Sequence, residues 1–63
     1  EEHLTMTETV ILQYLAQGLT NDQICKEMNL KLPTVKGHIY NIYKKMNVKN
    51  RVQAVKKWNE EKK

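Results

Sequence analysis

The chain has 63 residues, enough for one small domain, and its single cysteine excludes an internal disulfide bond. Eleven Lys and Arg residues against seven Asp and Glu residues give a formal net charge of +4, which favours an anionic partner. No apolar run approaches the roughly 18 residues of a membrane span, and the spacing of Cys and His offers no set of metal ligands. We therefore expect a cytoplasmic domain, held together by helix packing, that uses no membrane, metal ion or cofactor.

Sequence signals for helix starts and ends follow one another along the whole chain. Residues 1–63 are therefore interpreted as one domain, which we expect to be part of a longer protein. The sequences TMTE (5–8) and TNDQ (20–23) each match a capping box, in which two side chains satisfy backbone N–H groups at a helix start. Gly18 can adopt the positive φ that ends a helix, and Pro33 suits a first helical turn. Together with apolar residues at helical spacing, these signals predict an all-α domain with helices at about residues 6–17, 21–28, 32–46 and 51–59.

The third of these helices has two faces of opposite character. Apolar residues recur at helical spacing on one narrow stripe, formed by Val35, Ile39, Ile42 and Met46. The opposite face is polar and basic, and it carries Lys36, Gly37, Tyr40, Asn41 and Lys44. A short helix, a tight turn and a longer helix with such an outer face are typical of a helix-turn-helix, whose second helix enters the major groove of DNA.

Several side chains away from this face are interpreted as parts of the fold or of a contact between copies. Met6 is expected to fill a gap in the core, and Glu8 to be a helix-end or surface carboxylate. The charged tail at residues 60–63 is expected to fray. Val52 points away from the apolar side of the last helix, so it suits a small dimer contact, although single exposed apolar residues are common.

Two longer segments carry a resemblance to a known family. LTMTETVILQYLAQGLTNDQICKEMNL (4–30) and TVKGHIYNIYKKMNVKNRVQAV (34–55) resemble the LuxR/GerE-type helix-turn-helix DNA-binding domain of bacterial transcriptional regulators, over nearly the whole chain. The resemblance implies a four-helix bundle at the C-terminal end of a longer regulator. It implies sequence-specific binding of double-stranded DNA, with residues 32–46 in the major groove, residues 51–59 as a homodimer contact and RNA polymerase as a candidate partner. The preceding domain, whether a phosphoryl receiver, a small-ligand domain or a nucleotide-hydrolysing module, is left open.

The resemblance also assigns contact residues by position. Base contacts are expected from Lys36, Gly37 and Tyr40. Contacts to the DNA backbone are expected from Thr20, Asn21, Thr34, His38, Asn41, Lys44 and Lys45, and dimer contacts from Val52 and Lys56. The Lys36 ammonium can donate to guanine O6 or N7, for about 1–3 kcal/mol of discrimination. Gly37 either lets the helix sit deeper in the groove or only costs about 1 kcal/mol of helix stability.

Other functions fit the sequence less well. An enzyme is not expected, because the chain contains no serine, and Asp22 and Glu27 are interpreted as surface or helix-end carboxylates. Region four of a sigma factor shares the TVK segment, but GHIYNIYKKM (37–46) and VKNRVQAV (48–55) fit the LuxR pattern better. A small basic helical module that binds acidic proteins is the remaining alternative. Steep salt dependence and preference for one duplex sequence would distinguish DNA binding from it.

Overall fold

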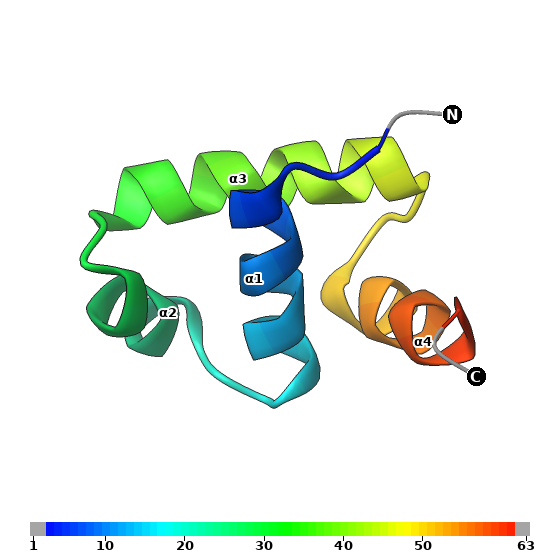
Figure 1. Cartoon of the computed structure of the whole chain (residues 1–63), viewed down its shortest axis with the longest axis horizontal. Helices are drawn as coiled ribbons and strands as arrows, with labels where there is room; N and C mark the ends of the chain where they lie inside the picture. The colour runs from blue at the N-terminus through cyan, green and yellow to red at the C-terminus, as the bar shows by residue number, and fades with distance from the viewer. Residues whose placement is uncertain (1–2, 62–63) are drawn as a thin grey trace.

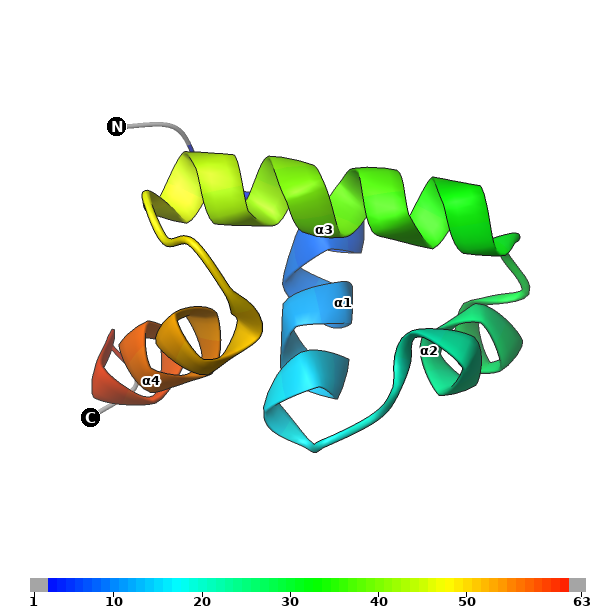
Figure 2. The same cartoon turned by 180° about the vertical axis from the view of Figure 1, so that it is seen from behind.

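The computed structural model of the chain describes residues 3–61, and every regular element in that range is an α-helix (Figure 1). The four helices of this described part are α1 (Met6–Ala16), α2 (Asn21–Met28), α3 (Leu32–Met46) and α4 (Arg51–Glu61). α3 lies along one side of the molecule, and α1 runs away from it between α2 and α4 (Figures 1 and 2). The predicted all-α fold with a helix-turn-helix is confirmed. None of the described helices is both long enough and apolar enough to cross a membrane.

The first two helices begin at the predicted capping boxes. The Thr5 hydroxyl accepts a hydrogen bond from the Glu8 backbone N–H (3.1 Å), and the Glu8 carboxylate accepts one from the Thr5 N–H (2.9 Å). Thr20 and Gln23 make the same reciprocal pair, at 3.2 and 2.8 Å. Each pair satisfies two N–H groups that a helix start would otherwise leave without a partner. Local sequence therefore determines where α1 and α2 begin.

Residues with positive φ follow the first three helices. Gly18, two residues after α1, has φ +91°, as the sequence predicts. Asn29 and Asn47 cap the C-terminal ends of α2 and α3, with φ of 55° and 59°. Asparagine is one of the few residues other than glycine that enter this region readily. These three residues turn the chain sharply, so the connections between the first three helices and their successors can be short.

α4 is longer than predicted. The sequence predicts an end near residue 59 and a frayed tail after it, but the helix continues to Glu61. Glutamate is a strong helix former, so nothing at residues 60 and 61 stops the helix. The last two residues of the predicted tail, 62 and 63, lie outside the described residues.

One apolar core joins the helices of the described chain. Its buried side chains come from every helix, and they are Ile11, Leu12, Leu15, Ile24, Val35, Ile39, Ile42, Met46 and Ala54. The predicted stripe of α3 is therefore confirmed. Tyr14, Cys25 and Trp58 are half-buried and pack against this core. The prediction that Met6 fills a gap is wrong, because this side chain is 85% exposed at the first position of α1.

Glu8 caps α1 as the sequence predicts, but it is not a surface carboxylate. Only 4% of the residue is exposed, and its Oε1 lies 2.8 Å from Nζ of Lys45 on α3. Burial alone would raise the pKa of Glu8. The hydrogen bond and charge of Lys45, together with the bonds from Thr5, outweigh burial and hold this pKa below its ordinary value of 4.5. The ion pair thus ties the start of α1 to the C-terminal end of α3.

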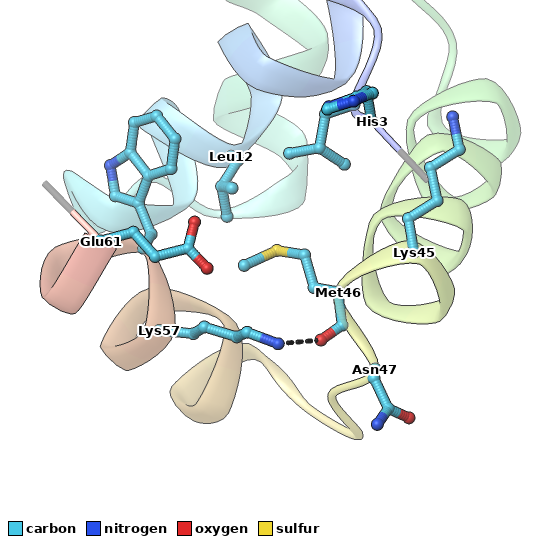
Figure 3. Close-up of a pocket in the computed structure, with 9 residues that line it drawn as sticks. His3, Leu12, Lys45, Met46, Asn47, Lys57 and Glu61 are labelled. Carbon is cyan, nitrogen blue, oxygen red and sulfur yellow. Dashed lines mark hydrogen bonds between the residues drawn. The ribbon is translucent and has the colours of Figure 1, made fainter. Parts of the chain in front are cut away.

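α4 is attached through two basic side chains that reach the ends of other helices. Nη2 of Arg51 donates to the carbonyl oxygen of Leu15, near the end of α1 (3.1 Å). Nζ of Lys57 donates to the carbonyl oxygen of Met46, the last residue of α3 (2.6 Å, Figure 3). Carbonyls at helix C-terminal ends carry partial negative charge, so cations stabilise them, and the Leu15 carbonyl accepts from Arg51 in addition to the Gly18 N–H. These bonds orient α4 relative to α1 and α3.

Candidate nucleic-acid interface

α2 and α3 form the helix-turn-helix, and their packing decides which face of α3 points outward. The chain reverses at Asn29, and the Leu30 N–H bonds back to the carbonyl oxygen of Cys25 (3.0 Å). Ile24 of α2 and Val35 of α3 are both 0% exposed and belong to the same core. α3 is therefore fixed with its apolar stripe inward and its basic face toward solvent.

The outward face of α3 is exposed along much of the helix. Its exposed residues are Thr34, Lys36, Gly37, Tyr40, Asn41 and Lys44. Tyr40 is 67% exposed although its ring is large and apolar. Within the described part of the chain, neither the Lys36 nor the Lys44 ammonium makes a hydrogen bond or an ion pair. The face therefore offers two uncommitted cations and an aromatic ring to an outside partner.

The other predicted contact residues differ in their accessibility. Thr20 is exposed at the start of α2, whereas Asn21 and His38 are half-buried. Lys45 does not join the outward face as a free cation, because its ammonium is bonded to Glu8 and its side chain is only 19% exposed. A phosphate could recruit Lys45 only by competing with that buried carboxylate.

The starts of α2 and α3 add hydrogen-bond donors beside this face, and the start of α3 also adds partial positive charge, whereas Asp22 offsets that charge in the first turn of α2. The Thr20 hydroxyl already accepts a hydrogen bond from the Gln23 N–H, which leaves its own proton free to donate. α3 begins after Lys31, which makes no side-chain cap, and its first turn carries no acidic residue. The positive end of the α3 dipole is therefore not neutralised locally, which favours an anion such as a phosphate.

The outward side of α4 presents the residues predicted to pair two copies. Val52 is 76% exposed, and Lys56, one turn later, is also exposed. Ala54 lies on the other side of the helix and is fully buried. The structure thus places the two predicted dimer residues on one accessible face, apart from the core.

A separate groove of about 600 Å³ lies between the N-terminal segment, the C-terminal end of α3 and α4 (Figure 3). It is lined by His3, Leu4, Leu12, Lys45, Met46, Asn47, Lys57, Trp58 and Glu61. None of the exposed residues of the outward face of α3 lines this groove, so the two surfaces are distinct. No group of three His, Cys, Asp or Glu residues in the described ranges could hold a metal ion there or elsewhere.

Comparison with known proteins identifies the family. Residues 2–58 match the family described as bacterial regulatory proteins, luxR family. The chain belongs to this family. The resemblance carried by the two long sequence segments is therefore confirmed, and membership of the luxR family supports sequence-specific DNA binding in transcription regulation.

Known relatives and a solved structure agree with this assignment. The chain is 49% identical to the nitrate/nitrite response regulator protein NarP of Escherichia coli (strain K12), over 81% of this chain and 24% of NarP. It is 45% identical to the transcriptional regulatory protein LiaR of Bacillus subtilis (strain 168), over 84% of this chain and 25% of LiaR. The crystal structure of the response regulator ChrA, from a heme-sensing two-component system, superposes with a TM-score of 0.91 at 35% identity, over 98% of this chain and 31% of ChrA. The chain spans about a quarter of the length of NarP and LiaR.

Sequence reasoning missed the structural roles of three residues of this luxR-family domain. Glu8 and Lys45 are 37 residues apart, and Arg51 lies 36 residues from Leu15, so no local spacing links these partners. Lys57 and Met46 are 11 residues apart, which is also beyond the reach of a local pattern.

Proposed function

We propose that this chain is the DNA-binding part of a longer cytoplasmic transcription regulator, with α3 lying in the major groove of double-stranded DNA. The outward face of α3 carries the proposal, because the side chains of Lys36 and Lys44 are exposed there and make no bond within the described residues. Membership of the luxR family and similarity to transcriptional regulatory proteins support it. The same similarity is the ground for proposing RNA polymerase as a partner of the complete regulator.

The contacts divide into two groups. Lys36, Gly37 and Tyr40 face the base edges, where a lysine can donate to guanine. Thr20, Asn21, Thr34, His38, Asn41 and Lys44 contact or support the phosphate backbone, helped by the positive start of α3, whose first turn carries no acidic residue. Lys45 is left out of this second group, because its bond to Glu8 already uses its charge.

Two copies of the domain pair through α4 on adjacent half-sites. The exposed Val52 side chain and the neighbouring Lys56 supply the contact. Because both recognition helices must enter the groove on the same side of the duplex, the half-site centres should lie about 10 base pairs apart. A footprint with one unpaired half-site at full affinity would argue against this arrangement.

The proposal is tested by comparing two lysine variants on a preferred duplex, chosen by selection from a random pool, and on duplexes with single base-pair changes. Lys36→Ala should lose about 1–3 kcal/mol on the preferred site and relax the preference at particular base pairs. Lys44→Ala should weaken binding to all duplexes alike and reduce the slope of log K against log[salt] by about 1. Equal and uniform losses for both variants would contradict the division of roles. Selection of no preferred duplex would instead favour a module that binds acidic proteins.

A further inference from the structure

Gly37 lies inside α3 although the fold does not require a glycine there. Its φ is not in the positive range, so other residues could adopt its conformation. A Cβ built at this position meets no atom of the described chain within 4 Å, so alanine would also fit. Glycine is less favourable than alanine inside a helix. The helix is therefore weakened at Gly37 without any gain in packing.

Tyr40 lies one turn after Gly37 on the same face of α3, although none of its side-chain atoms comes within 4 Å of a Cβ built at Gly37. Side chains on a helix lean toward the turn before their own Cα, so the ring of residue 40 extends over the turn that contains residue 37. The ring is 67% exposed, and Lys36, four residues before it, lies on the same side of the helix. We call the open space between the Gly37 backbone and the Tyr40 ring the Gly37 gap. The Tyr40 ring is the exposed large apolar group of this otherwise polar face.

The Gly37 gap matches one chemical group of the major groove. Base edges there present hydrogen-bond donors and acceptors, and the apolar exception is the C5 methyl group of thymine. An exposed aromatic ring gains free energy by burying such a methyl group, and a missing side chain lets the helix backbone approach it. We infer that the Gly37 gap receives the C5 methyl of a thymine, with Tyr40 as its wall. The inference rests on the proposed function, because α3 must already lie in the major groove.

The test removes the methyl group from the DNA and leaves base pairing intact. Each thymine of the preferred duplex is replaced in turn by uracil, which lacks only the C5 methyl, and affinity is measured by fluorescence anisotropy at fixed salt. One thymine in each half-site should give about a fourfold loss, the value expected for one buried methyl group. The other thymines should give little change.

Variants of the chain separate this contact from general binding. Tyr40→Ala should bind the thymine and uracil duplexes equally, whereas Tyr40→Phe, which keeps the ring, should retain the difference. Lys44→Ala is the matched control: it should weaken binding to both duplexes and keep their ratio. Gly37→Ala should raise the melting temperature by about 4–8 °C and yet bind the thymine duplex less tightly, because the added methyl group fills the gap.

The outcomes distinguish the inference from the proposed function. If a preferred duplex is selected but uracil is tolerated at every position, the methyl contact is refuted and DNA recognition by α3 still stands. The same conclusion holds if Gly37→Ala binds as tightly as the unchanged chain. If no duplex is preferred over random DNA, the proposed function fails and the methyl contact fails with it.

Discussion

Two groups of basic side chains in this domain differ in what they contact. Lys36 and Lys44, on the outward face of α3, are exposed and make no bond in the described structure. Lys45, Arg51 and Lys57 instead donate to a buried carboxylate or to carbonyls at helix ends. The net charge of +4 counts both groups alike. Only the first group is directly available to an anionic ligand, so position, rather than total charge, defines the interface.

The sharpest test of this difference compares adjacent lysines. Lys45→Ala leaves Glu8 buried without its cation, which should lower the free energy of unfolding by about 2–3 kcal/mol. Lys44→Ala removes an exposed side chain with no partner in the described residues, so stability should change by less than about 0.5 kcal/mol. Urea unfolding measures both changes in stability. DNA affinity should fall more in Lys44→Ala than in Lys45→Ala, once binding is corrected for the fraction of folded protein. Equal stability losses in both variants would remove the distinction between the groups.

The bond from Arg51 to α1 should have an intermediate effect. Arg51→Ala removes a charged donor from a helix-end carbonyl, and we expect a loss of about 1–2 kcal/mol in the free energy of unfolding. Lys56→Ala, on the exposed side of α4, is the matched control and should be close to neutral. Thermal unfolding followed by circular dichroism compares the two. If Lys56→Ala destabilises the domain as much as Arg51→Ala does, the carbonyl bond does not hold α4 in place.

The same difference in contacts explains what sequence alone could predict. The starts of α1 and α2 depend on side chains three residues apart, and the buried stripe of α3 repeats every turn, so both are local patterns. The outward face follows from that stripe because it is the opposite side of the helix. The burial of Met6 was predicted wrongly because Met6 is the first residue of its helix. No earlier turn carries an apolar residue that would show which face of the helix is buried. The end of α4 was predicted too early because the glutamates at residues 60 and 61 favour a helix and the sequence there contains no residue that ends one.

The contacts that sequence reasoning missed join residues that are distant in sequence. Lys44 and Lys45 are neighbours, and sequence reasoning assigned both to phosphate contacts. In a helix, neighbouring residues point in directions about 100° apart, so one can face DNA while the other faces the protein. Which of the two turns inward depends on Glu8, 37 residues away from Lys45. Only the packing of α1 on α3 brings that carboxylate within reach.

The smallest expected effect is a change of stability with pH that comes from Glu8. Its pKa is lowered by folding, so its contribution to stability is present above the ordinary value of 4.5 and is lost as the pH falls through the folded pKa. The effect is small because burial opposes the bonds from Lys45 and Thr5.

Glu8→Gln keeps a hydrogen-bond acceptor but has no charge to lose, so the stability advantage of the unchanged chain over this variant should shrink below pH 4.5. Urea midpoints measured between pH 6 and pH 3 check this, with Glu60→Gln, an exposed α4 residue, as control. An advantage that stays constant across that range would mean that the ion pair contributes nothing beyond its hydrogen bonds.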